Sequence, residues 1–180
     1  KVITGRFLKF LKEQAEKEEN KYGEFWKKFG NFIREGAASD ADFRDDLLQL
    51  MRFESSKLDP GKLTSLDDYI SRMKEDQKAI YYLNAPSREM ADAGPYMEAF
   101  RRKDLEVLYT EDAADDYIFN LIGEYKGKKL VSADQENLEL PEIRGEASED
   151  EMLPENEIEG FKNWLKGVLG EKVSIIRESK

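Results

Sequence analysis

Apolar residues in the first 57 positions recur at intervals of three or four, which is the period of an amphipathic helix. The first two stretches carry these apolar positions: Phe7, Leu8, Phe10 and Leu11, then Tyr22, Phe25, Trp26, Phe29 and Ile33. Gly36 stands where the second helix is expected to end. A third helix is expected after it, with one apolar side: Phe43, Leu47, Leu50 and Met51. The pattern therefore predicts helices whose aromatic side chains lie in a core.

A capping-box signature predicts the next helix. Ser65 follows a Pro-Gly turn, and Asp68 stands three positions later, so each side chain can bond the backbone amide of the other. Apolar residues then occupy positions i, i+3, i+4 and i+7 of the helix: Leu66, Tyr69, Ile70 and Met73. We expect this face to be buried, and Arg72, Lys74 and Glu75 to face water.

From residue 78 short apolar segments alternate with helical ones. Strands are expected at residues 79–83, 105–109 and 130–132. Ser87 is expected to cap a helix that breaks near Gly94 and continues to Arg102. Asp112 opens another helix, after which the chain is expected to turn at Gly127. The apolar side of this helix carries Ile118, Leu121, Ile122 and Tyr125.

This order of elements, strand-helix-strand-helix-strand, predicts a small parallel sheet with right-handed crossovers and helices on its faces. The predicted fold class is therefore α/β, or α+β for the chain as a whole. It comprises a helical connector followed by a small αβα lobe with a short parallel sheet.

Acidic residues are concentrated between residues 134 and 157. This segment holds ten acids against one base, Arg144, and so has a net charge of −9, while the whole chain has −10. Two prolines, one glycine and dense like charge predict an extended or mobile linker. A further helix is expected from Ile158, ended by Gly170, with a strand that begins at Lys172. The chain is thus expected to start a second domain after the linker.

The composition argues against several classes of chemistry. The chain has no cysteine and no histidine, which excludes disulfides, thiolate nucleophiles, serine-histidine relays and the usual zinc ligand sets. No spacing of its acids matches a calcium loop, so no metal site is expected. The chain has no concentrated basic face and no apolar run as long as a membrane span. Nucleic acid and membrane are therefore not expected as partners.

Phosphate-binding loops are the first candidates for chemistry, because ligands favour the carboxyl ends of parallel strands. Residues 84–87 follow the first strand without a glycine-rich turn. In residues 123–129 three residues separate the glycines instead of four, the final Ser or Thr is absent, and the segment leaves a helix. We interpret this segment as a basic helix stop. The serines and paired carboxylates are interpreted as caps, turns and solvated acids, so no catalytic or cofactor-binding residue is expected.

The helix opened by Asp112 offers a candidate surface for recognition. Tyr117 and Asn120 lie off its apolar stripe, and Phe119 points in a third direction. Aromatic groups with a polar rim on the outside of a helix can dock a partner. They can equally pack against a following domain, and both interpretations stay open at this point.

Several longer strings of residues are typical of one family. They are Arg52 to Ser56, Thr64 to Leu66 with Tyr69, Ser71 to Met73, Ile80 to Tyr82, and Gly127 to Ser132. On these strings the chain resembles the middle domain of the ninety-kilodalton heat-shock chaperones. Residues 85–88 and 95–99 are more similar to the bacterial high-temperature protein G type and its organellar relatives than to the eukaryotic cytosolic branch. The resemblance covers nearly the whole chain and implies that it belongs to a longer protein.

The resemblance implies four segments along the chain. They are 1–57, the end of the larger middle-domain lobe and the helical connector; 58–133, the small αβα lobe; 134–157, the acidic linker; and 158–180, the start of the C-terminal dimerisation domain. In this family an N-terminal domain holds ATP and magnesium, and the middle-domain arginine that reaches the nucleotide lies upstream of Lys1. The chain itself is therefore expected to be a monomer without a cofactor and without enzymatic activity. The parent is expected to be a homodimeric ATPase of the bacterial cytoplasm or of an organelle matrix.

The resemblance also implies a client-binding site at Asp116, Tyr117 and Asn120, with tyrosine where the family often has tryptophan or phenylalanine. The implied function is that of an ATP-dependent molecular chaperone, which binds non-native client proteins and assists their folding. The adjoining N-terminal and C-terminal domains of the parent are its other implied partners. A small doubly wound nucleotide-binding enzyme domain and a helical adaptor module stay as alternatives. A nucleotide-binding assay separates the first, and circular dichroism the second.

Overall fold

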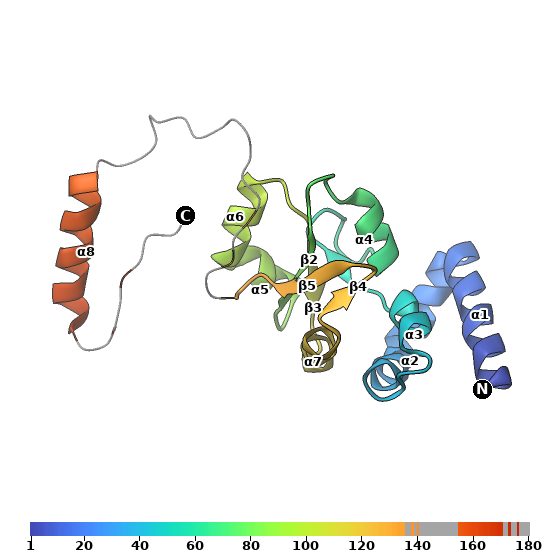
Figure 1. The fold of residues 1–180 in the computed structure, drawn as a ribbon. Coiled ribbons are helices and arrows are strands. Elements are labelled where there is room, and N and C mark those ends of the chain that lie inside the picture. Colours follow the sequence, from blue (N-terminus) through green and yellow to red (C-terminus); the bar gives the residue numbers. More distant parts are fainter. Residues whose placement is uncertain (136–137, 139, 141–154, 171–172, 174–175, 177–180) are drawn as a thin grey trace. The chain divides into compact units, whose positions relative to one another are not determined.

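The computed structural model describes residues 1–135, 138, 140, 155–170, 173 and 176 of the chain. The chain forms two compact units, Lys1–Pro141 and Glu142–Lys180, and each is described by itself. The first unit holds helices α1 to α7 and a sheet, and the second holds α8 (Figure 1). Most of the predicted acidic linker lies outside the described residues.

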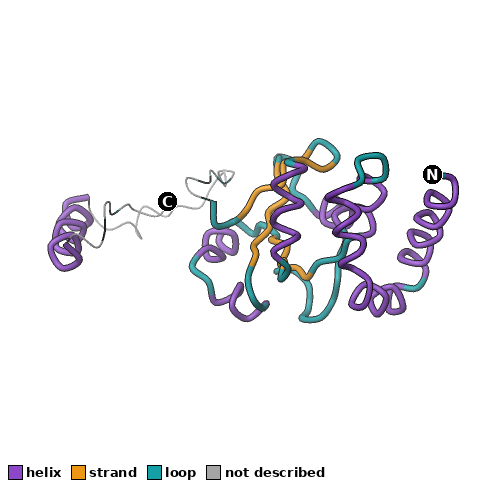
Figure 2. The backbone as a smooth tube through the Cα atoms, turned by 90° about the horizontal axis from the view of Figure 1, so that it is seen from below, coloured by secondary structure: helices purple, strands orange, loops and turns teal. Residues whose placement is uncertain are grey.

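Helices form the first part of the chain, as the periodicity predicts (Figure 2). They are α1, Val2–Lys17; α2, Glu19–Ser39; and α3, Arg44–Leu50. Their core residues follow the spacing of three and four: Leu8, Leu11 and Ala15 in α1, and Tyr22, Trp26 and Ile33 in α2. Phe7, Phe10 and Phe29 are exposed, so the prediction that they lie in the core was wrong. Phe7 and Phe10 each stand one residue before a core leucine, which turns them about 100° away from the buried stripe.

Gly36 lies inside α2 and does not end it. A Cβ atom at this position would lie 3.0 Å from Cδ1 of Leu47 in α3. The missing side chain therefore lets α2 and α3 approach closely, and α2 continues to Ser39. The prediction that Gly36 ends the helix was wrong, because this glycine serves helix packing.

The sheet of the first unit has the strand order β1-β3-β2-β5-β4. Its strands are β1, Glu54–Ser55; β2, Ala79–Asn84; β3, Val107–Thr110; β4, Glu124–Tyr125; and β5, Lys128–Ser132. The central strands β3, β2 and β5 run parallel, which confirms the predicted α/β class. The presence of this sheet also argues against a purely helical module. β1 and β4 add antiparallel edges that were not predicted, because two residues are too short to show an alternating pattern.

Side chains of β2 reach both faces of the sheet. Ile80 and Tyr82 join the core shared with α1, α2, α3 and α7, whereas Tyr81 and Leu83 join the core shared with α5 and α6. Successive strand residues point to opposite faces, so this alternation follows from the backbone. The covering helices are α4, Leu66–Arg72; α5, Arg88–Ala93; α6, Tyr96–Arg102; and α7, Ala113–Ile122 (Figure 1). The middle strand is therefore held from both sides.

The capping box at the start of α4 is confirmed. Ser65 accepts a hydrogen bond from the backbone amide of Asp68, and the Asp68 carboxylate accepts one from the amide of Ser65. Arg72 is exposed, as expected, but it also has a buried partner. Its guanidinium donates to the buried carboxylate of Glu106, with Nη2 2.7 Å from Oε1 and Nε 3.0 Å from Oε2. The pattern of α4 alone could not show a partner that lies 34 residues away.

The end of α7 also differs from the prediction. The helix ends at Ile122, because Gly123 takes a positive φ of 73°, and Tyr125 lies in β4 instead of the helix. Gly127 forms the turn of the β4–β5 hairpin, also with positive φ. Phe119 is fully buried, whereas Leu121 is 47% exposed, so their expected positions are exchanged.

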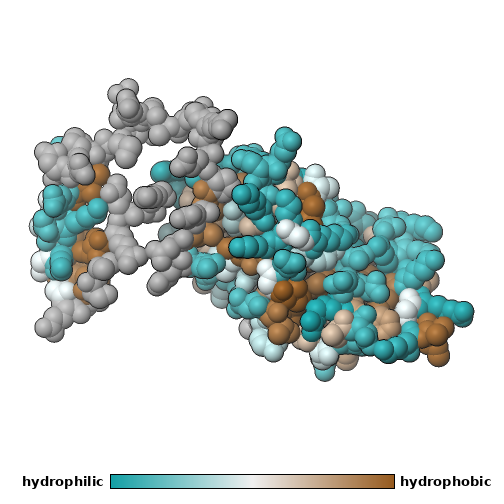
Figure 3. Space-filling model, in the orientation of Figure 1, coloured by the Kyte–Doolittle hydropathy of each residue, from teal (hydrophilic) through white to brown (hydrophobic). Residues whose placement is uncertain are grey.

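The second unit is described mainly by α8, Glu155–Leu169, which ends at Gly170 as predicted. Its exposed apolar side chains are Phe161, Trp164 and Val168, and the rings of Phe161 and Trp164 stack with their centroids 5.8 Å apart. Figure 3 shows both hydrophobic and hydrophilic surface on this helix. The predicted strand from Lys172 lies outside the described residues, apart from Val173 and Ile176. Within the described part of the chain, no helix is long and apolar enough to cross a membrane.

Candidate functional site

Helix α7 positions all three predicted site residues. Asp112 caps its start by accepting a hydrogen bond from the amide of Ala114. Ile118 and Phe119 are fully buried and hold the helix on the sheet. Asp116 and Asn120 lie one turn apart on another side, and Tyr117 is 62% exposed. The candidate site is thus on a helix that is anchored by its opposite face.

Asp116 is fixed in place from the sheet. The Tyr82 hydroxyl donates to Oδ1 of Asp116 over 3.1 Å, and Nδ2 of Asn120 donates to the Asp116 carbonyl oxygen over 2.9 Å. Burial and the neighbouring Asp116 carboxylate raise the pKa of Tyr82 above its ordinary value. Tyr82 therefore stays protonated at neutral pH and remains a hydrogen-bond donor to Asp116.

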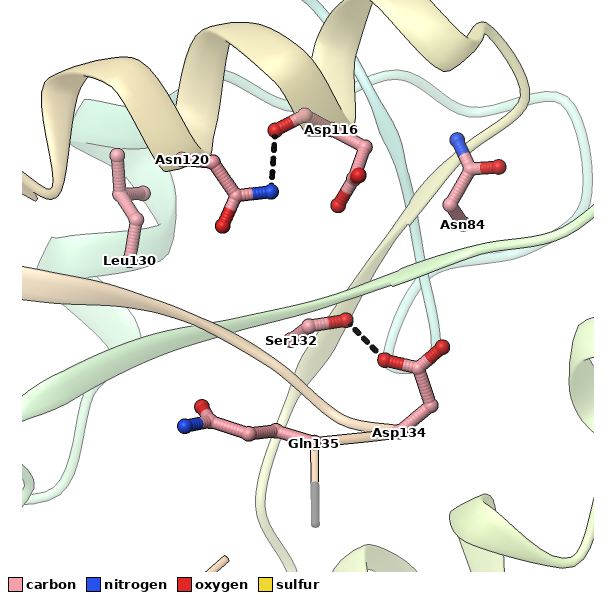
Figure 4. A pocket seen from close by; sticks show the side chains of 7 residues that line it. All are labelled: Asn84, Asp116, Asn120, Leu130, Ser132, Asp134 and Gln135. Atoms are coloured by element: carbon pink, nitrogen blue, oxygen red, sulfur yellow. Dashed lines mark hydrogen bonds between the residues drawn. The ribbon is translucent and has the colours of Figure 1, made fainter.

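A cleft of about 580 Å³ opens beside these two residues (Figure 4). Its lining residues are Asn84, Asp116, Asn120, Leu130, Ser132, Asp134 and Gln135. Asp116 and Asn120 come from α7, Asn84 ends β2, and Ser132 ends β5. Tyr117 is not among the lining residues. The structure therefore brings two of the three predicted residues into one cleft and leaves the third on the adjoining surface.

Four polar residues of the cleft were missed in the sequence. Asn84 lies far along the chain from Ser132, Asp134 and Gln135, and only the pairing of β2 with β5 brings it next to them. The available signal was their position at the carboxyl ends of two predicted parallel strands, where polar side chains meet. Ser132 donates a hydrogen bond to Oδ1 of Asp134, which orders this side of the cleft.

An ion pair ties α7 to α2. Arg34 donates to Asp115 through Nε, 2.7 Å from Oδ1, and through Nη2, 3.1 Å from Oδ2. The guanidinium also lies 4.6 Å above the ring of Trp26. Burial raises the pKa of Asp115 above its usual value, while Arg34 opposes that rise. Asp115 is thus a structural residue that holds α7, in contrast to its exposed neighbour Tyr117.

The segment 123–129 has the geometry of a connection between α7 and the sheet. It includes the helix-ending Gly123, strand β4 and the hairpin turn at Gly127. A phosphate loop, by contrast, runs from a strand into the start of a helix. The arrangement fits the interpretation of a basic helix stop, and it gives no support to the alternative of a nucleotide-binding enzyme domain.

Comparisons with known proteins agree on one family. The family described as Hsp90 protein matches residues 1–180. Chaperone protein HtpG of Desulfitobacterium hafniense is 52% identical over 180 residues, which are 100% of this chain and 29% of that protein. The mitochondrial heat shock protein 75 kDa of Bos taurus is 36% identical over 183 residues, covering 98% of this chain and 26% of that protein. The chain therefore spans less than a third of these relatives, and it belongs to the Hsp90 family of chaperones.

Proposed function

We propose that this chain is the middle-domain segment of an ATP-dependent chaperone, followed by the start of its C-terminal domain, and that it binds non-native client proteins to assist their folding. The names of the relatives support the chaperone role. The arrangement of helices, small αβα lobe and later helix supports the assignment of the segments.

The segment acts in this proposal without catalytic residues or a cofactor of its own. ATP and magnesium belong to an N-terminal domain of the parent, and this chain transmits and uses the resulting conformational change. The helix-to-sheet connection formed by residues 123–129 supports this division of labour, because it lacks the geometry of a phosphate site. The parent acts as a homodimer in the bacterial cytoplasm or in an organelle matrix, and bacterial and mitochondrial relatives support both locations.

The exposed ring of Tyr117 beside Asp116 and Asn120 is the observation that carries the client-binding proposal. The Tyr117 side chain is 62% exposed and therefore available to a partner, and its helix is anchored through Asp115 and Phe119. Burying one such ring against a client contributes about 1 to 2 kcal/mol without demanding one client sequence. Two such faces in a dimer would add avidity, because the second contact is intramolecular.

The test is the double variant Tyr117→Ala with Asn120→Ala. Reduced and alkylated α-lactalbumin, which stays unfolded, serves as the client, and binding is followed by NMR shifts of the α7 amides. We expect the variant to bind at least about fivefold more weakly, since it loses the ring contact and one hydrogen-bonding group. Its melting temperature should stay unchanged, because both side chains are exposed.

The matched control replaces the same two residue types elsewhere on the surface. Tyr96 on α6 is 49% exposed, and Asn20 on α2 is also exposed, so Tyr96→Ala with Asn20→Ala removes the same side-chain atoms from another part of the surface. This control should bind the client as the parent chain does. Equal binding by the Tyr117 variant would reject the proposed face, and a clear loss of its melting temperature would point to packing instead.

A further inference from the structure

The cleft beside Asp116 lies where the strand order of the sheet reverses. From β2 the chain adds β3 on one side through α5 and α6, and it then adds β5 on the other side through α7. Asn84 and Ser132, at the carboxyl ends of β2 and β5, line the cleft between these directions. In open parallel sheets this point leaves a crevice in which ligands bind.

The lining of the cleft favours a positively charged ligand. Six of its seven side chains are polar, two of them are carboxylates, and none is basic. Asp116 and Asp134 hold their carboxylates through hydrogen bonds from Tyr82 and Ser132 (Figure 4 draws the second). Amide oxygens of Asn84, Asn120 and Gln135 add neutral acceptors around them.

The donor set suits an organic cation better than a metal ion. A dedicated calcium site gathers six to eight oxygen ligands, and the described part of the chain holds no group of three acids arranged for a metal. A guanidinium has five N–H donors in a planar fork, which match carboxylate and amide oxygens at separate points of a cleft. Leu130 gives the apolar stem of such a side chain a surface to pack on. The volume of about 580 Å³ is large enough for one such side chain.

We propose that this cleft takes a cationic side chain of the bound client segment, preferentially arginine, while Tyr117 contacts an apolar client residue next to it. The inference rests on the proposed client-binding function and adds a substrate class to it. Clients would then be selected for segments in which an arginine lies close to an apolar side chain. Such segments are exposed in unfolded chains, where both groups are accessible at once.

The probe is a pair of short peptides with blocked ends. One contains leucine, serine and glycine around a single central arginine, and the other has citrulline in its place, which keeps the shape but removes the charge. Each is titrated into the isotope-labelled chain, and binding is read from the amide shifts of Asn120 and Ser132. We expect the arginine peptide to bind at least about fivefold more tightly.

The variant that tests the cleft is Asp116→Asn with Asp134→Asn. Asparagine keeps an oxygen that can accept from Tyr82 and Ser132, so the charge is removed while the hydrogen bonds can persist. This variant should bind both peptides equally. The control is Glu75→Gln, which also removes one negative charge at its site. Glu75 is exposed and precedes β2 in the chain, and this variant should keep the preference for arginine.

Each outcome decides the inference. Loss of the arginine preference in the Asp116 and Asp134 variant alone supports it. Equal binding of both peptides by the parent chain, with shifts on α7, overturns the inference and leaves the proposed client face standing. A preference that survives in the variant also overturns it, because the general negative charge of the chain would then be the cause. Shifts from neither peptide on α7 count against the client face and the inference together.

Discussion

At the scale of single residues, Glu106 shows how one buried carboxylate joins separate elements. Arg72 of α4 donates two hydrogen bonds to it, and the hydroxyl of Ser55 in β1 donates a third. Hydrogen bonding to Glu106 raises the pKa of Arg72, so the guanidinium stays charged at neutral pH. A helical pattern places Arg72 on the solvent side correctly, but it cannot show this partner, because periodicity contains no information about a carboxylate elsewhere in the chain.

Replacing Glu106 by glutamine should lower the free energy of unfolding by about 2 to 3 kcal/mol. The substitution leaves the Arg72 guanidinium, which is about one third exposed, beside a neutral amide that can accept at only one of its two atoms. Urea unfolding followed by tryptophan fluorescence measures the change. This decrease in unfolding free energy is smaller than the one expected for a fully buried ion pair, because water still reaches Arg72.

Glu98→Gln is the matched control for this change. Glu98 pairs with Arg102 on α6, but both side chains are exposed: Glu98 by 67% and Arg102 by 77%. Glu98→Gln should lower the free energy of unfolding by less than about 0.5 kcal/mol. Similar effects of the two substitutions would show that the Glu106 cluster does not stabilise the fold beyond an ordinary surface pair.

At the scale of elements, the sequence predicts that helices and strands exist better than where they end. The three parallel strands and the capped start of α4 were predicted correctly, because alternation and capping are local signals. Gly36 was expected to end α2 and Gly127 to turn the chain at the end of α7, and both expectations were wrong, because α2 continues to Ser39 and Gly123 ends α7. A glycine can end a helix, admit a neighbouring helix or form a hairpin turn, and only the packed structure distinguishes these roles.

Gly36→Ala should therefore behave differently from Gly5→Ala, although both change a glycine inside a helix. At Gly5 the new Cβ would lie 3.9 Å from Phe43, an ordinary contact, so the change should stabilise the chain by about 0.5 to 1 kcal/mol through helix propensity. At Gly36 the Cβ would lie 3.0 Å from Leu47, so repacking should remove that gain. We expect the two unfolding free energies to differ by at least about 1 kcal/mol. Equal gains at both sites would contradict a packing role for Gly36.

At the scale of the whole molecule, the cleft was only partly predictable. Asp116 and Asn120 were expected as site residues and do line it, whereas Asn84, Ser132, Asp134 and Gln135 were not. Helical spacing is enough to place residues one turn apart on α7. The other residues meet α7 only because β5 pairs with β2, and this pairing is a property of the sheet topology.

The two cores of the first unit lead to a prediction about its independence. Their described members all lie within Lys1–Pro141, and they include Leu138 and Leu140, which are partly buried against the core of α5 and α6. A chain shortened to residues 1–141 should therefore unfold cooperatively, with a free energy within about 0.5 kcal/mol of that measured for the same transition in the full chain. A second transition in the full chain would belong to residues 142–180.

The leucines locate the end of this unit. In the shortened chain, Leu138→Ala with Leu140→Ala should lower the unfolding free energy by about 1 to 2 kcal/mol, because each loses part of its buried apolar area. Met90→Ala, at a position 60% exposed on α5, is the control and should change it by less than about 0.5 kcal/mol. If the double leucine variant were as stable as its parent, the folded unit would end before Leu138.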